Sequence, residues 1–115
     1  MNKHQWIQES SAAITVCDTQ GIIIEMNDQA TTVFQKRGGK KLVGSNLMDC
    51  YPEPARTKIR QLIEKQQTNI YTVEKNGITR LIYQAPWYTG GEYSGFMEIS
   101  FIVPASMPHI IRDSS

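Results

Sequence analysis

The fold of this chain is decided by one stretch near the N-terminus, which reads Asp18-Thr19-Gln20-Gly21-Ile22-Ile23-Ile24-Glu25-Met26-Asn27-Asp28-Gln29-Ala30. Asp18 and Gly21 suit the first and last positions of a type I turn that is followed by a left-handed residue. The segments on either side, residues 13–17 and 21–26, are apolar and rich in β-branched side chains. Together they predict a β-hairpin.

A helix is predicted directly after the hairpin. Asn27 can cap it by accepting a hydrogen bond from a free backbone amide of the first turn, and Asp28 adds negative charge near the helix N-terminus. We expect this helix over residues 27–34. Its buried stripe would consist of residues spaced i, i+3 and i+4, namely Ala30, Val33 and Phe34.

Further along the chain, the charged and glycine-containing residues 36–41 predict an exposed loop. After it, helical periodicity predicts the longest helix at about residues 53–66. The apolar positions that set this periodicity are Ala55, Ile59, Leu62 and Ile63.

Three strands are predicted to follow, over residues 69–75, 78–88 and 93–103. Asn76-Gly77 between the first two is a strong signal for a tight hairpin turn. Pro86 lies inside the middle strand, where it marks an irregular or unpaired backbone position.

This order of elements predicts an α+β fold, because helices placed between two groups of strands should cover one face of a single sheet. We expect a five-stranded antiparallel sheet with short helices on one face, plus a short N-terminal helix. The expected organisation is an N-terminal helical cap at residues 1–11, one domain at residues 12–103 and a loosely held tail at residues 104–115.

Alternation along the strands predicts which side chains face the helices. Placing the larger apolar residues inward leaves Thr15, Gln84, Glu98 and Ser100 on the opposite face. The expected apolar interior is formed by Ile24, Met26, Val33, Phe34, Leu47, Ile59, Leu62, Ile63, Tyr83, Met97, Ile99 and Phe101.

The composition narrows the class of protein. Of the 115 residues 40% are hydrophobic, and 12 basic against 11 acidic side chains leave a net charge of +1. This balance argues against binding to nucleic acid or to a membrane surface, and the lack of a long apolar run predicts a cytoplasmic protein. We expect the two cysteines, Cys17 and Cys50, to be reduced thiols that pack in the core.

Little in the sequence favours catalysis. It contains no known nucleophile, metalloprotease or phosphate-binding motif, and its two histidines, His4 and His109, lie in the terminal arms. A small enzyme remains one alternative, with Tyr83, Cys50 and a carboxylate as its best available groups. We expect no metal site.

The stretch Asp18 to Ala30 resembles the opening hairpin and helix of PAS domains, where an Asp-x-x-Gly turn precedes a strand and then Asn and Ala. The later Gly44-Ser45-Asn46-Leu47 segment and the final three strands also match the PAS pattern, so the resemblance covers about residues 12–103. It implies a sensory or signal-transduction module of the bacterial type, commonly dimeric, whose cleft between sheet and helices can bind a small molecule.

The resemblance also bears on the cofactor, whose identity stays open. Light-sensing flavin members carry a reactive cysteine where this chain has Leu47, and Cys50 lies three residues further on, which argues against a cysteinyl-flavin. Residues 53–66 hold no histidine, which argues against a histidine-ligated haem. The candidate ligand-binding residues are Ile24, Met26, Phe34, Leu47, Ile59, Ile63, Tyr83, Met97 and Ile99.

A partner surface is predicted on the sheet face away from the helices. Its candidate residues are Phe96 and Ile102, which would leave an apolar strip, and Trp6 and Ile7, which would cover that strip within the same chain or from a second subunit. We therefore expect a homodimer that acts in trans on a separate signalling protein. A ligand-free homodimerisation adaptor with a fully packed interior is the other alternative.

Overall fold

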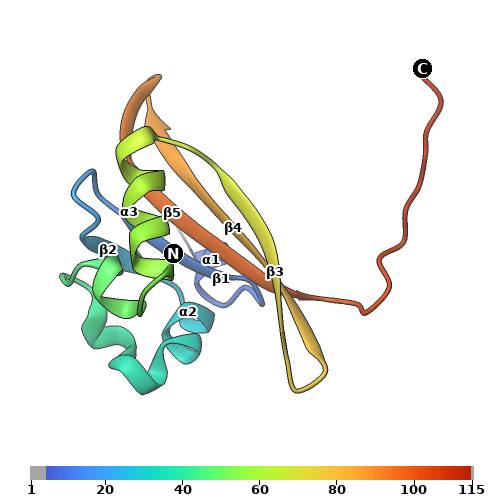
Figure 1. Cartoon of the computed structure of the whole chain (residues 1–115), viewed down its shortest axis with the longest axis horizontal. Helices are drawn as coiled ribbons and strands as arrows, with labels where there is room; N and C mark the ends of the chain where they lie inside the picture. Colours follow the sequence, from blue (N-terminus) through green and yellow to red (C-terminus); the bar gives the residue numbers. More distant parts are fainter. Residues whose placement is uncertain (1–4, 115) are drawn as a thin grey trace.

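The computed structural model describes residues 5–114 and shows one antiparallel sheet with helical segments beside it (Figure 1). The strands are β1 (Ala13–Cys17), β2 (Ile23–Met26), β3 (Asn69–Lys75), β4 (Ile78–Thr89) and β5 (Glu92–Val103). They are ordered β2-β1-β5-β4-β3, so the last strand of the chain lies at the centre. The predicted five-stranded antiparallel sheet is confirmed.

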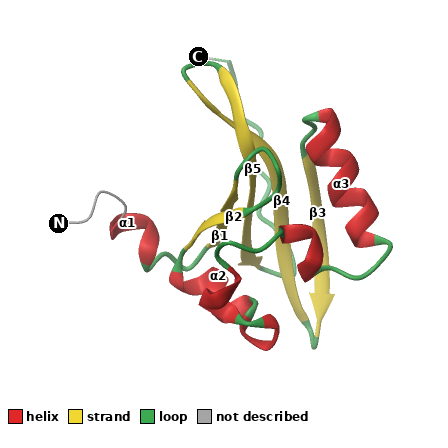
Figure 2. Ribbon diagram, turned by 90° about the vertical axis from the view of Figure 1, so that its left-hand side faces the viewer, coloured by secondary structure: helices red, strands yellow, loops and turns green. Residues whose placement is uncertain are grey.

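The helical segments lie between β2 and β3 in the sequence, apart from the short α1 (Gln5–Gln8). They comprise α2 (Asp28–Val33), the 3₁₀ turns η1 (Gln35–Arg37), η2 (Gly39–Leu42) and η3 (Leu47–Cys50), and α3 (Ala55–Lys65). Figure 2 shows α1 and α3 on opposite sides of the strands. The predicted first residues of the N-terminal cap lie outside the described part of the chain. Residues 36–41 are exposed as predicted, apart from Gly39, and belong to η1 and η2 except for Gly38.

The opening hairpin forms as the sequence predicts. The Asp18 carboxylate accepts from the backbone amides of Gln20 at 2.8 Å and Ile22 at 3.0 Å, and Gly21 adopts a φ of +83°. Asn27 caps α2, because its side-chain oxygen accepts from the amide of Ala30 at 3.1 Å. Glycine is favoured at the left-handed position because a Cβ strains that conformation.

Asn27 does more than the cap that was predicted for it. Its oxygen also accepts from the amide of Ile14 at 2.9 Å, and its amide group donates to the carbonyls of Ile7 at 2.9 Å and Ala12 at 2.8 Å. One buried side chain therefore joins α1, β1 and α2.

The irregularity predicted at Pro86 has a simple geometric basis. β3 begins opposite Gln84, so the segment of β4 from Ala85 onward pairs only with β5. Proline has no amide hydrogen, and at this place none is needed toward β3. The register of the β4–β5 pair shifts just beyond, between Trp87 and Tyr88.

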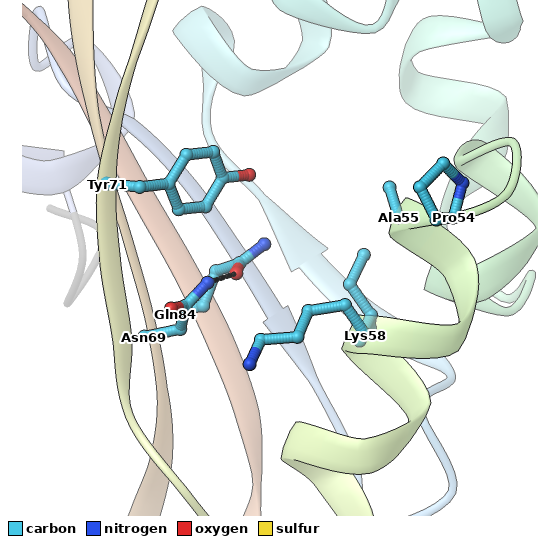
Figure 3. A pocket seen from close by; sticks show the side chains of 7 residues that line it. Pro54, Ala55, Lys58, Asn69, Tyr71 and Gln84 are labelled. Carbon is cyan, nitrogen blue, oxygen red and sulfur yellow. Dashed lines mark hydrogen bonds between the residues drawn. The ribbon is translucent and has the colours of Figure 1, made fainter.

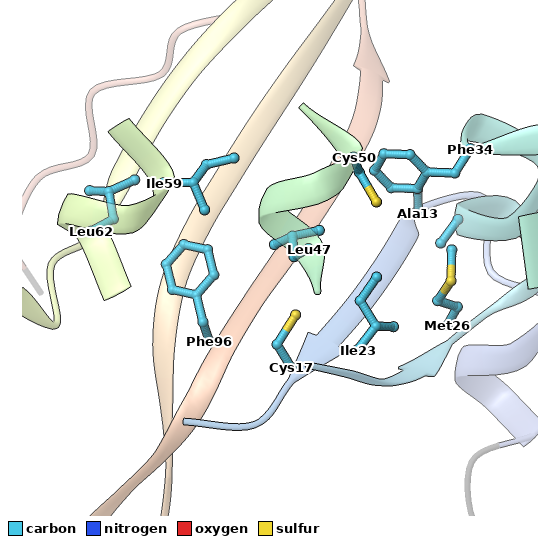
Figure 4. Packing of buried hydrophobic residues seen from close by; sticks show 11 residues of the cluster. Ala13, Cys17, Ile23, Met26, Phe34, Leu47, Cys50, Ile59, Leu62 and Phe96 are labelled. Atoms are coloured by element: carbon cyan, nitrogen blue, oxygen red, sulfur yellow. The ribbon is translucent and has the colours of Figure 1, made fainter. Parts of the chain in front are cut away.

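The hydrophobic core lies between the sheet and the helical segments (Figure 4). Phe96, Leu47 and Cys17 are fully buried at its centre, where strands β5 and β1 meet η3. The complete cluster consists of Ala13, Cys17, Ile23, Met26, Ala30, Phe34, Leu47, Cys50, Ile59, Leu62 and Phe96. Both cysteines are free and buried, as predicted.

The predicted orientation of the strands is wrong. Thr15, Gln84, Glu98 and Ser100 are all buried, with exposed fractions of 2 to 6%, although they were expected on the opposite face. In the predicted interior, Ile24, Val33 and Phe101 are 48%, 43% and 38% exposed. For the strand residues of β1, β4 and β5 the reason is that these strands carry apolar side chains on both faces, so alternation alone leaves two possible orientations. Ile24 is the residue without a partner where the β1–β2 register shifts, and Val33 is the last residue of α2.

Candidate functional site

A row of polar side chains crosses the sheet on the face that carries the helices. Asn69 of β3 lies opposite Gln84 of β4, Gln84 lies opposite Glu98 of β5, and Glu98 lies opposite Thr15 of β1. We call these four residues the polar row. Directly paired residues on neighbouring strands point to the same side of a sheet, so the row is continuous from the β3 edge to β1.

Hydrogen bonds connect Asn69, Gln84 and Glu98 of this row in one direction. The amide of Asn69 donates to the Gln84 oxygen at 3.1 Å, and the amide of Gln84 donates to the Glu98 Oε2 at 2.8 Å. The hydroxyl of Tyr51, which follows η3, lies 2.7 and 2.8 Å from the two oxygens of Glu98. When Glu98 is ionised its carboxylate only accepts, and in that state Gln84 presents its N–H to Glu98 and its oxygen to Asn69.

The electrostatics of the row are dominated by burial. Glu98 is 6% exposed, and its removal from water raises the pKa of its carboxyl group, against the opposing effect of the hydrogen bonds from Gln84 and Tyr51. Burial, and then the nearby Glu98 charge, also raise the pKa of the Tyr51 hydroxyl, so Tyr51 is the donor in their bond.

A groove opens at the Asn69 end of the row, between α3 and the strands (Figure 3). Its volume is about 370 Å³, which lies at the lower end of the range for small-molecule sites. Figure 3 shows Tyr71 on the strand side, Ala55 and Pro54 across from it, and Lys58 reaching from α3 toward the strands. The groove is lined by Pro54, Ala55, Lys58, Ile59, Asn69, Tyr71 and Gln84.

Of the nine predicted ligand-binding residues, Ile59 lines this groove. Met26, Phe34 and Leu47 are packed in the core cluster, and Ile63 is partly buried against it. Ile24 is 48% exposed, so its predicted place in the interior is wrong.

Tyr83, Met97 and Ile99 lie on the sheet face away from the core, opposite to the prediction. Ile99 pairs with Ile14 and with Tyr83, and Tyr83 pairs with Ile70 of β3. These neighbours alternate with the polar row along their strands. Tyr83 is next to Gln84, and Met97 and Ile99 flank Glu98, so the three residues point to the opposite side of the sheet from the polar row.

The four residues predicted for the partner surface do not share one face of the sheet. Phe96 is fully buried in the core, so its predicted place on a partner surface is wrong. Ile102 is 61% exposed but shares the inner face with Arg80, its partner on β4, because the Arg80 guanidinium donates to the Ser100 hydroxyl at 3.2 Å. Trp6 is 78% exposed, and Ile7 lies beside Ile14 on the outer side of β1.

The sequence reasoning missed Asn69, Lys58 and Tyr51, and it turned Gln84 and Glu98 to the wrong face. A usable signal existed, since Gln84 and Glu98 each stand directly between two apolar or aromatic residues of their strands. Polar residues in such strands are either solvated or joined by hydrogen bonds, and their pairing across β4 and β5 makes the second arrangement possible.

The two cysteines lack the features of a reactive site. Burial, with smaller effects from nearby Glu98 and Asp18, raises the pKa of the Cys17 thiol to about 12. Burial also raises the pKa of Cys50. Within residues 5–114, no group of three or more His, Cys, Asp or Glu side chains is arranged to hold a metal ion. None of the helices in that range is long and apolar enough to cross a membrane.

Comparison with known proteins places this architecture in a family. The chain is similar to the C-terminal domain of a Streptococcus mutans protein, with 18% identity and a TM-score of 0.69 over 84% of this chain and 79% of that one. It is also similar to the PAS domain of Bordetella pertussis BvgS, with 17% identity and a TM-score of 0.64 over 86% and 82% of the two chains.

A third similar structure is the Aer2 receptor of Vibrio cholerae, described as a dual PAS–haem oxygen sensor, with 16% identity and a TM-score of 0.58 over 81% and 95% of the two chains. No curated protein sequence matches the chain. A family model described as the PAS fold matches residues 3–79. The chain therefore belongs to the PAS family, whose fold is that of sensory modules in sensor kinases and other signalling proteins.

Proposed function

We propose that the chain is a non-catalytic sensory module that binds a small molecule in the groove between α3 and β3. The observation that carries this proposal is the directed hydrogen-bond chain from Asn69 through Gln84 to Glu98. Asn69 and Gln84 line the groove, whereas Glu98 belongs to the central strand. A ligand that bonds to either amide would compete with the existing bonds and change the surroundings of Glu98.

The size of the response is limited by thermodynamics. A ligand shifts the module between two arrangements only by the difference in its affinity for them. The polar row offers such a difference, because Gln84 is 2% exposed and a lost hydrogen bond at that depth is not replaced by water.

The ligand is testable by native mass spectrometry of the purified protein and by amide shifts in ¹H–¹⁵N spectra during titration with small fragments. We expect shifts clustered at Asn69, Tyr71 and Gln84. Ala55→Trp should fill the groove and abolish them, whereas Ala105→Trp, a matched change at an exposed position in the tail, should not. A protein that purifies empty and shows no groove shift with any fragment contradicts the proposal.

We further propose that the outer sheet face forms a homodimer. This face, defined by Ile14, Ile70, Tyr83, Ile99 and Phe101, combines side chains from four strands. Ile70 and Phe101 are 58% and 38% exposed, and α1 reaches only the β1 side. An apolar surface shared by two copies buries itself in an isologous contact. The dimer would pass the change at Glu98 to a separate signalling protein in trans.

Two adjacent residues separate the outer face from the inner one. Phe101→Glu places a charge on the outer face and should convert the dimer to monomers in sedimentation velocity. Ile102→Glu changes a more exposed residue of the same strand on the opposite face and should leave the dimer intact. Dissociation by Ile102→Glu alone contradicts the outer-face contact, and a stable dimer that binds no ligand favours the adaptor alternative.

A further inference from the structure

We propose that the groove selects small organic carboxylates with a compact apolar or aromatic body. This inference rests on the proposed function, since it names the chemical class of the ligand for the same groove. It follows from three properties of the groove: its apolar walls, its excess of hydrogen-bond donors and the position of its single lining cation.

The apolar walls of the groove favour a ligand with an apolar body. Pro54, Ala55 and Ile59 form the α3 side, and the Tyr71 ring forms the strand side (Figure 3). Ile59 is 2% exposed and belongs to the hydrophobic core, so the groove ends there on an apolar side chain. Surfaces of this kind favour a flat or branched hydrocarbon group, which loses its contact with water when it enters.

The polar groups favour an anion at the other end of the ligand. Lys58 is the only charged residue that lines the groove, and its ammonium group only donates. Asn69 uses one N–H toward Gln84 and keeps a second, and Tyr71 carries a hydroxyl. A carboxylate accepts from several such donors at once, and charge-assisted bonds of this kind are stronger than bonds between neutral groups.

The buried acid nearby opposes the Lys58 charge, since burial and then the Glu98 charge raise the pKa of the Tyr71 hydroxyl, but only Lys58 of the two lines the groove. The Glu98 carboxyl lies behind Gln84, is 6% exposed and bonds to Gln84 and Tyr51. A single lining cation beside apolar walls suits one carboxylate better than a phosphate group, whose double charge calls for more cations.

The test compares benzoate with benzamide, which has nearly the same shape but no charge. Each is titrated into the ¹⁵N-labelled full chain, with the Asn69 side-chain amide and the backbone amides of Tyr71 and Gln84 as readouts. We expect benzoate to bind about five- to tenfold more tightly than benzamide. Lys58→Met should remove this preference while benzamide binding persists. Lys65→Met, on the same helix but outside the groove, should keep it.

The outcomes separate this inference from the proposed function. Equal binding of benzoate and benzamide, or a preference that survives Lys58→Met, overturns the carboxylate selectivity while a groove ligand still stands. Groove shifts caused only by uncharged or cationic fragments overturn it in the same way. If no fragment shifts the amide signals of the groove, both proposals are overturned.

Discussion

Replacing the buried carboxylate of Glu98 by an amide should change how the stability of the protein depends on pH. Glu98 is 6% exposed, and burial raises its pKa above the value in the unfolded chain. Between these two pKa values the folded protein holds a proton that the unfolded chain releases. Stability therefore falls as pH rises through this window, and it falls no further above the folded-state pKa.

The magnitude follows from proton linkage. One proton bound only by the folded state gives a slope of up to about 1.4 kcal/mol per pH unit inside the window. Glu98→Gln does not titrate, and its carbonyl can accept from the Gln84 amide while its new amide group donates to the Tyr51 hydroxyl oxygen. The variant should match the wild type under acidic conditions and become the more stable protein as the pH rises.

Urea unfolding at a series of pH values, followed by tryptophan fluorescence, measures this difference; Trp6 is already 78% exposed, so we expect Trp87 to give most of the change. Subtracting the two curves removes the contribution of all other titrating groups. Glu92→Gln, an exposed position at the start of the same strand, is the control and should track the wild type. If the Glu98→Gln and wild-type stabilities stay parallel from about pH 4 to pH 9, the burial argument is refuted.

Three other predictions concern packing and capping. Gly95→Ala should destabilise the protein by about 3 kcal/mol or more in urea unfolding, because a Cβ would collide with the Cys17 carbonyl oxygen and lie 2.7 Å from the Trp87 indole nitrogen; an unchanged midpoint contradicts it. Asn27→Ala should cost about 2–4 kcal/mol, since four backbone groups lose their partner; Asn27→Asp keeps both acceptor bonds but sets a carboxylate oxygen against the Ile7 and Ala12 carbonyls, so it should also destabilise, and a wild-type midpoint for either variant contradicts the argument. Cys17 and Cys50 should resist Ellman's reagent in the folded protein at about pH 8 and react once urea unfolds it, because both thiols are buried with raised pKa values; rapid labelling of the folded chain would exclude this reading.

The sequence predicted local structure correctly at positions where the residue type favours one conformation. Asp18 and Gly21 set the turn, Asn27 capped the helix, and Asn76-Gly77 closed the hairpin between β3 and β4, because few conformations suit those side chains. The order of these elements then led to the five-stranded antiparallel sheet.

The candidate site was less accessible, since it depends on side chains from distant segments. Tyr51 bonds to Glu98, which is 47 positions further along the chain. Lys58 of α3 and Asn69 of β3 line the same groove. The local sequence around these residues does not indicate either pair. An alternating strand can place either of its two faces inward. Which face is favoured depends on whether its polar side chains gain hydrogen-bond partners, and those partners come from other strands and helices of the folded chain.

The sequence by itself determined the turns, the cap, the approximate spans of helix and strand, and through them the PAS architecture. Tertiary structure alone decided which face of the sheet is inside. Apolar residues occupy both faces of β1, β4 and β5, so hydrophobicity did not distinguish them. The inner face is the one on which Gln84, Glu98 and Tyr51 satisfy one another's hydrogen bonds, because buried polar groups without partners would cost more than the exposed apolar side chains opposite.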